Sequence, residues 1–153
     1  MGRRVFKLED PFREIMERDI TKKFYSELFT ACGTTLESLF KYDNKDNTHV
    51  WVYDANDEIL AILVFEDLGE EFHIVGVSNN FVINKTILDE TKPGGSLYQV
   101  MENFAINMNV KKISLESIKI RIGYWKMWGF YSTGDPEDGQ FCKLFPMAKE
   151  LTQ

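Results

Sequence analysis

Residues 71–117 read EFHIVGVSNNFVINKTILDETKPGGSLYQVMENFAINMNVKKISLES, and this stretch decides the fold. Its apolar run at 72–78 predicts a strand, and 112–117 predicts a second one. Between them, helical spacing predicts a helix that begins at Gly94 and ends near Asn109, a residue suited to a left-handed cap. The stripe of that helix comprises Leu97, Val100, Met101, Phe104, Ala105 and Met108. This strand–helix–strand crossover implies a parallel strand pair at the centre of a mixed sheet.

Working outward, the flanking segments complete a mixed α+β pattern. On the N-terminal side we expect a strand at 4–8, a helix begun by Asp10-Pro11 and running through Leu28, a short helix from Thr34, and strands at 48–53 and 58–65. On the C-terminal side we expect a helix at 118–128 ended by Gly129, then a hairpin of 130–133 and 140–147. Residues 79–93 predict a loop. The pattern favours an α+β fold, with one domain over residues 1–153.

Composition excludes several classes of protein. The chain has 153 residues and a formal net charge of −6, which opposes nucleic-acid binding. This charge either attracts cationic partners or merely keeps the protein soluble, and the charge alone favours the second interpretation. No apolar run is long enough to span a membrane, and no secretory signal follows the N-terminal basic pair. Cys32 and Cys142 form no metal-binding cluster, so we expect no metal and two free thiols. These features predict a cytoplasmic protein, with the nucleus as an alternative.

The segment Lys92-Pro93-Gly94-Gly95-Ser96-Leu97 precedes the central helix. Two glycines allow close approach of a ligand to the backbone, and a helix start offers unpaired N–H groups to an anion. Ser96 adds a hydroxyl group and Lys92 adds a positive charge. The pattern is neither a nucleotide P-loop nor a GxGxxG dinucleotide turn. It predicts a phosphate-binding turn, and an ordinary turn before a helix is an equal alternative.

The segment Ile122-Gly123-Tyr124-Trp125-Lys126-Met127-Trp128-Gly129-Phe130 places aromatic residues at the end of a helix. Core packing and a glycine cap explain most of this pattern. Taken together with the segment 92–117, however, it resembles the GNAT superfamily of acyl-CoA N-acyltransferases, and its last helix is close to the histone-acetyltransferase branch. The resemblance covers residues 48–151. The sequence departs from the family pattern at Asp89, where an Arg or Gln is usual, and at Lys92, where the first glycine is usual.

The resemblance implies a mostly antiparallel mixed sheet whose central parallel strands splay apart to bind acetyl-CoA. The backbone around Val75, Val77 and Ser78 is expected to bind the pantetheine arm, with Gly76 allowing a bulge that frees its groups. The start of the helix, residues 92–97, is expected to bind the phosphates. Trp125 stands where many family members have a tyrosine, and is expected to contact the cosubstrate.

The same resemblance implies direct transfer of the acetyl group to an amine, which needs a base. His73 stands where the histone-acetylating branch has a glutamate, and it is expected to share a face with Val75 and Val77. The alternative is that His73 is a half-exposed strand residue, and Glu116 is a weaker candidate base. Tyr124 is the candidate donor to the departing thiolate. Tyr131 is a further candidate, with core packing as its alternative role.

Three functions follow as alternatives. The first is an N-acetyltransferase acting on a primary amine, either a small amine or a protein lysine or N-terminus. The second is a catalytically silent acyl-CoA-binding sensor or scaffold. The third is a sheet-based interaction module with no link to coenzyme A. The acidic turn at Asp135, Glu137 and Asp138 borders the acceptor groove in such a fold, or is a solvated hairpin tip. We expect a monomer or homodimer that binds neither nucleic acid nor membrane.

Overall fold

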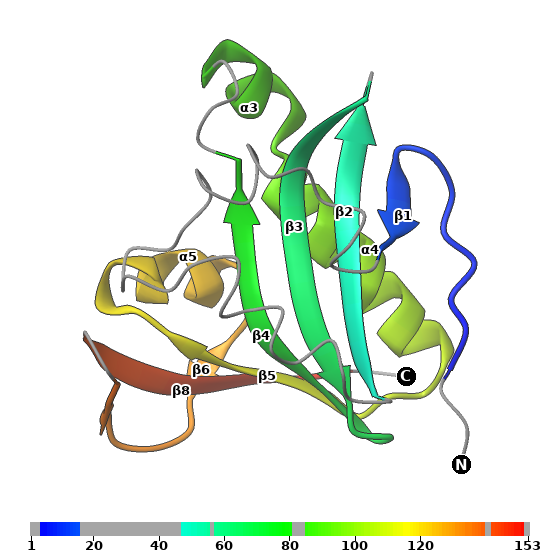
Figure 1. Ribbon diagram of the computed structural model, residues 1–153. Helices are drawn as coiled ribbons and strands as arrows, with labels where there is room; N and C mark the ends of the chain where they lie inside the picture. Colours follow the sequence, from blue (N-terminus) through cyan, green and yellow to red (C-terminus); the bar gives the residue numbers. More distant parts are fainter. Residues whose placement is uncertain (1–3, 16–46, 56, 81–84, 140–141, 152–153) are drawn as a thin grey trace.

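The computed structural model describes residues 4–15, 47–55, 57–80, 85–139 and 142–151 (Figure 1). One eight-stranded sheet has the order β1-β2-β3-β4-β5-β8-β6, and β7 pairs with β8. The strands are β1 (Phe12–Glu14), β2 (Thr48–Ala55), β3 (Glu58–Asp67), β4 (Glu71–Asn79), β5 (Lys112–Ser117), β6 (Tyr131–Ser132), β7 (Glu137–Asp138) and β8 (Lys143–Glu150). The helices are α3 (Lys85–Thr91), α4 (Pro93–Asn107) and α5 (Ile122–Met127), with a 3₁₀ turn, η2 (Lys119–Arg121), before α5.

The central part of the fold agrees with the sequence analysis. Strands β2, β3 and β4 form an antiparallel meander, and β4 pairs in parallel with β5. Helix α4 makes the crossover between that parallel pair, and Asn109 adopts the left-handed conformation expected of it, with φ of 62°. The expected α+β architecture, with a mixed and mostly antiparallel sheet, is therefore confirmed.

The strands expected at 48–53 and 58–65 are present as β2 and β3, whereas the expectations for residues 4–15 are wrong. Residues 4–8 form no strand, and Asp10-Pro11 begins a turn into β1 instead of a helix. The reason is a tertiary contact: Phe12 pairs with Tyr53 of β2, and the Asp54 amide donates to the Pro11 carbonyl. The rest of the expected first helix and the second helix lie outside the described residues.

Three smaller expectations also need correction. The loop expected at 79–93 contains α3, and the helix expected at 118–128 is shortened to α5 after a 3₁₀ turn. Cys142 is disulfide-bonded and is not a free thiol, and the other cysteine of the chain, Cys32, lies outside the described residues.

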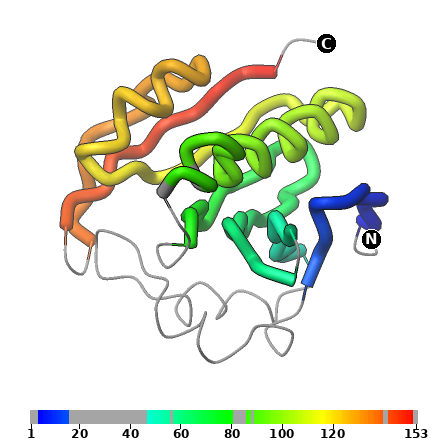
Figure 2. Tube along the Cα trace, turned by 90° about the horizontal axis from the view of Figure 1, so that it is seen from above, coloured from blue at the N-terminus to red at the C-terminus, as the bar shows by residue number. Residues whose placement is uncertain are grey.

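The core divides into two clusters, one on each face of the sheet. The larger cluster lies on the face covered by α4 and contains Trp51, Phe65, Phe72, Leu97, Tyr98, Met101, Ile113 and Trp125. The smaller cluster, on the opposite face, contains Ile15, Val50, Val52, Ile62 and Val64. Figure 2 shows α4 from above, lying along one side of the strands. Because both faces are buried, the middle of β3 reads as a continuous apolar run.

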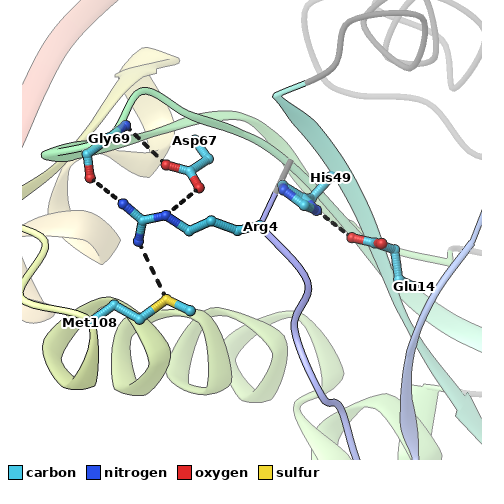
Figure 3. A network of polar contacts seen from close by, with 6 residues as sticks. All are labelled: Arg4, Glu14, His49, Asp67, Gly69 and Met108. Carbon is cyan, nitrogen blue, oxygen red and sulfur yellow. Dashed lines mark hydrogen bonds and ion pairs between the residues drawn. The ribbon is translucent and has the colours of Figure 1, made fainter. Parts of the chain in front are cut away.

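The N-terminal segment is held to the sheet by Arg4 (Figure 3). Its guanidinium pairs with Asp67 at 2.9 Å and donates to the Gly69 carbonyl at 2.8 Å. A third N–H contacts the sulfur of Met108 at 3.4 Å, beside the end of α4. On the next strand pair, buried His49 contacts the Glu14 carboxylate. These contacts tie the first described residues to the β3–β4 turn, to α4 and to β2.

A second polar network lies inside the larger core. The Tyr98 hydroxyl donates to the Glu102 carboxylate at 2.8 Å within α4, and Lys149 of β8 pairs with the same carboxylate oxygen at 2.5 Å. Tyr98 is fully buried, and burial, followed by the bond to Glu102, raises the pKa of its hydroxyl. The network therefore joins α4 to the last strand through groups that have few alternative partners.

Candidate functional site

The parallel pair β4–β5 separates halfway along its length. Pairing runs from Glu71 opposite Lys112 to Ile74 opposite Leu115, and then ends. Beyond that point β4 continues with β3, and β5 continues with β8. Figure 1 shows the two strands diverging. The splayed central pair implied by the family resemblance is thus present, and it leaves one edge of residues 75–79 without a partner among the described strands.

A β-bulge lies where the two strands separate. Val64 of β3 is opposite Gly76, whereas the next residue, Phe65, is opposite Ile74, so Val75 is the extra residue on β4. A bulge next to Gly76 agrees with the expectation from the sequence. The extra residue reverses the alternation of side chains, because strand side chains alternate with period two.

This reversal corrects one expectation about β4. Val75 packs against the smaller cluster, whereas Val77 packs against the larger one on the α4 side. His73 and Val75 therefore share a face, and Val77 does not share it. The bulge thus turns the second half of β4, including Val77 and Asn79, toward the start of α4.

Helix α4 begins with an unusual backbone turn. Lys92 is left-handed, with φ of 45° and ψ of 57°, and Pro93 occupies the first turn of the helix. A left-handed lysine costs roughly 1 kcal/mol, a penalty that glycine avoids. Lys92 replaces the first glycine of the family motif, and it nonetheless keeps the backbone conformation that a glycine adopts readily. Lys92 therefore adopts a backbone conformation that glycine would adopt at lower cost.

The amides at this helix start are only partly open. The Gly94 amide donates to the Asn79 side-chain oxygen at 2.9 Å, and the Ser96 amide bonds to the Lys92 carbonyl at 2.9 Å. The Gly95 amide has no acceptor among the described residues. Our expectation of several exposed amides thus holds for Gly95, whereas Gly94 is capped by Asn79.

Asn79 is a site residue that the sequence analysis did not identify. It ends β4, 15 residues before the amide that it caps. Asparagine is a favoured capping residue, and this preference was the only signal in the sequence. The sequence alone could not assign Asn79 to α4, because Asn79 reaches the helix only through the bulge in β4 and the separation of β4 from β5.

A cavity of about 630 Å³ opens beside this helix start. Its walls are Asn79, Asp89, Lys92, Gly95, Ser96, Gln99, Tyr124 and Trp128. A side chain at Gly95 would enter it, because a Cβ there would lie 3.3 Å from the Tyr124 hydroxyl and 3.6 Å from Trp128. The absence of a side chain at Gly95 thus keeps the space between α4 and α5 open.

The structure brings four of the expected site residues together in this cavity: Lys92, Gly95, Ser96 and Tyr124. Pro93, Gly94 and Leu97 are buried and do not line it. Trp125 is 6% exposed and packs on Tyr98 and Phe130, so its ring belongs to the core, whereas Trp128 lines the cavity instead. Val75 and Ser78 are half-buried on the splayed part of β4.

His73 and Glu116 lie on the other face of the sheet from α4. The neighbours of His73 along β4, Phe72 and Ile74, point into the larger cluster, so His73 points the opposite way. Its Nδ1 contacts the Ser114 hydroxyl at 2.8 Å across the parallel pair. Glu116 is exposed, two residues further along β5 than Ser114. Among the residues that the structure describes, neither His73 nor Glu116 contacts a residue of the cavity wall.

Tyr131, the further candidate donor, lies away from the cavity. Its side chain is 46% exposed on β6, and its hydroxyl donates to Glu150 at 2.7 Å. That hydrogen bond raises the pKa of the hydroxyl. Tyr131 is thus neither a core residue nor part of the cavity wall.

The described residues contain no group of His, Cys, Asp and Glu side chains arranged to hold a metal ion. Within the same part of the chain, no helix has the length and apolar character needed to cross a membrane.

Comparison with known proteins gives a clear result for the structure and none for the sequence. No protein-family model matches the chain, and no curated protein matches its sequence. The structure is similar to the ribosomal-protein-S18-alanine N-acetyltransferase from Escherichia coli, with a TM-score of 0.72 at 13% identity over 93% of this chain and 94% of that one.

Two further solved structures show the same likeness. An acyl-CoA N-acyltransferase from Pseudomonas aeruginosa has a TM-score of 0.67 at 15% identity, covering 90% of this chain and 97% of that one. A GNAT family acetyltransferase from Elizabethkingia anophelis, solved with acetyl-CoA bound, has a TM-score of 0.65 at 15% identity, covering 94% and 100%. The chain therefore has the GNAT fold, as the resemblance in its sequence predicted.

Proposed function

We propose that the protein is an N-acetyltransferase that moves an acetyl group from acetyl-CoA to a primary amine. The observation that carries this proposal is the separation of β4 from β5 beside the cavity at the start of α4. Unpaired backbone groups of residues 75–79 offer the pantetheine amides a strand-like partner. A cationic acceptor is compatible with the formal net charge of −6.

The residues around the cavity suit a diphosphate in part. The Gly95 amide and the Lys92 ammonium group are available to an anion, at a helix start that favours negative charge. The Gly94 amide becomes available only if Asn79 turns away. Asp89 adds an unfavourable charge to the same wall. Coenzyme A is therefore expected to bind through fewer contacts with the protein than the full family motif provides.

Direct transfer needs a base and a proton donor, and the candidates for these two roles lie on opposite faces of the sheet. The amine nitrogen attacks the thioester carbonyl carbon, a C–N bond forms, and the C–S bond breaks. The proton of the amine passes to a base, for which His73 is the first candidate and Glu116 the second. The Tyr124 hydroxyl, on the opposite side of the strands, supplies a proton to the departing thiolate. The open ends of β4 and β5 would connect these two sides.

A catalytically silent acyl-CoA-binding domain is the second candidate function. The specific observation that favours it is the Asn79 side chain, which occupies an amide that the phosphates would use. Both candidates predict binding of acetyl-CoA, and only the first predicts its consumption.

The test has two stages. Acetyl-CoA at 100 times its dissociation constant should stabilise the fold by roughly 2.7 kcal/mol, which corresponds to a rise in Tm of roughly 5–10 °C. Release of free thiol with a panel of amines then separates the enzyme from the silent domain. No stabilisation by acetyl-CoA would contradict both.

A matched pair of glycine variants locates the binding site. Gly95→Leu fills the space in front of Tyr124 and should abolish the stabilisation by acetyl-CoA. Gly123→Leu is the control, because a Cβ at Gly123 meets no atom within 4 Å. Equal stabilisation of both variants would place the ligand elsewhere.

A further inference from the structure

A chain of hydrogen bonds crosses the paired half of β4 and β5. The Ser114 hydroxyl donates to the Glu71 carboxylate, and the same hydroxyl oxygen lies 2.8 Å from His73 Nδ1. The other oxygen of Glu71 lies 3.4 Å from the Lys112 ammonium group. The four residues form two directly opposite pairs of the parallel ladder, Glu71 with Lys112 and His73 with Ser114.

The direction of these bonds fixes the position of a proton. A serine hydroxyl has one hydrogen, and Ser114 gives it to Glu71. The Ser114 oxygen can then only accept a hydrogen bond from the imidazole, so His73 Nδ1 carries a hydrogen. In the neutral ring, Nε2 is left with the lone pair. Lys112 pairs with one oxygen of the Glu71 carboxylate, and the other oxygen accepts the hydrogen from Ser114.

The geometry points to Ser114 and Glu71 as positioning residues that make His73 Nε2 the base of the acetyl transfer. This inference rests on the proposed function. As the amine attacks, its proton passes to Nε2 and the ring becomes a cation. The negative charge of Glu71, transmitted through the Ser114 hydroxyl, stabilises that cation and holds the ring plane. Neither positioning residue touches the substrate.

The position along the sheet supports this role. His73 precedes the last paired residue, Ile74, so its ring lies beside the point where the strands separate. The bond to Ser114 spans the part of the ladder that is still closed, and it therefore keeps its geometry while the open part receives a ligand. On the other neighbouring strand, Glu66 of β3 lies opposite His73 and is the competing carboxylate.

The first measurement does not depend on enzymatic activity. The chain has two histidines, so the long-range ¹H–¹⁵N spectrum of the full protein contains two imidazole systems. The neutral ring of His73 should carry its hydrogen on Nδ1, and Ser114→Ala should abolish this preference, while His49 stays unchanged as an internal reference. A hydrogen on Nε2 in the wild-type protein would overturn the inference.

The second measurement is kinetic. Ser114→Ala should lower kcat by about tenfold or more, part of the 10²–10⁴ that a general base contributes, with the KM for acetyl-CoA unchanged. Ser114→Thr, which keeps the hydroxyl, should restore both the Nδ1 hydrogen and kcat. Glu71→Gln should keep the Nδ1 hydrogen, because an amide oxygen still accepts from Ser114, yet lower kcat through loss of charge.

Two controls separate the outcomes. Ser117→Ala changes a serine on the same strand whose hydroxyl donates to the Ile118 carbonyl, and it should alter neither readout. The positioning role alone is overturned if Ser114→Ala keeps the wild-type kcat. It is also overturned if Glu66→Gln shifts the tautomer of His73 and Ser114→Ala does not. A wild-type protein that transfers no acetyl group overturns the proposed function and this role together.

Discussion

Two polar networks in this fold use the same three groups, a hydroxyl, a carboxylate and a lysine. In the core, Tyr98 donates to Glu102, which pairs with Lys149. On the opposite face of the sheet, Ser114 donates to Glu71, which pairs with Lys112. The two networks contain the same kinds of side chain, but they differ in burial and in the further residues that they contact.

Burial determines whether such a network contributes mainly to stability. Glu102 is almost fully buried, so removing any member leaves a polar group without water. The Glu71 side chain is 27% exposed and that of Lys112 is 46% exposed, so water replaces much of what is lost there. The second set also contacts His73, a residue able to take up a proton. We therefore expect the first network to control stability and the second to control rate.

The largest effect should come from Glu102→Ala. It leaves the Tyr98 hydroxyl and the Lys149 ammonium group without their shared acceptor, and we expect the free energy of unfolding to fall by about 3 kcal/mol. Urea denaturation measures this change. Asn103→Ala, on the exposed side of the same helix, is the control and should cost less than about 0.5 kcal/mol. A loss of similar size in both variants would show that the network is not responsible for the effect.

Tyr98→Phe should have an intermediate effect, about 1–2 kcal/mol at neutral pH, because one buried hydrogen bond is lost. Its pH dependence carries the sharper information. The pKa of Tyr98 is raised by burial and by Glu102, so above about pH 10 the unfolded chain loses this proton while the folded protein keeps it. Stability from this group is complete below that pH and declines above it. Denaturation from pH 7 to 11 should show the gap between wild type and Tyr98→Phe narrowing, and a constant gap would argue against the buried hydroxyl.

The smallest effect on stability should come from Glu71→Gln, at less than about 0.5 kcal/mol, since its ion pair is partly exposed. Chemical denaturation of this variant beside Glu102→Ala makes the comparison direct. A cost above about 2 kcal/mol for Glu71→Gln would remove the distinction between the two networks. The kcat of this variant would then have to be corrected for its folded fraction.

The sequence predicted the central crossover well because its patterns are local. Strand β5 has the predicted bounds, and α4 begins one residue before the predicted position. Both elements are long enough for their apolar spacing to be unambiguous. The segment around Pro11 was mispredicted because Asp-Pro suits a turn as well as a helix start. Its pairing with Tyr53, 41 residues away from Phe12, decided between the two.

The candidate site was only partly predictable for the same reason. Lys92, Gly95 and Ser96 of the helix start are close together in sequence, and they line one cavity. Asn79 and Ser114 could not be identified, because each acts on a residue brought near by the sheet: Gly94 for the first and His73 for the second. Trp125 and Trp128 lie on successive turns of one aromatic segment, and only the packing of α5 shows which ring is buried.

The extra residue at Val75 determines to which face of the sheet each later side chain of β4 points. With it, Val77 and Asn79 face α4, and removing one residue before them would exchange inward and outward positions for the rest of the strand. A single deletion there would thus cost the helix its cap without touching α4 itself, whereas a deletion of two residues would preserve parity. Among natural or laboratory variants that keep this helix start, length changes in this half of β4 should therefore come in even numbers.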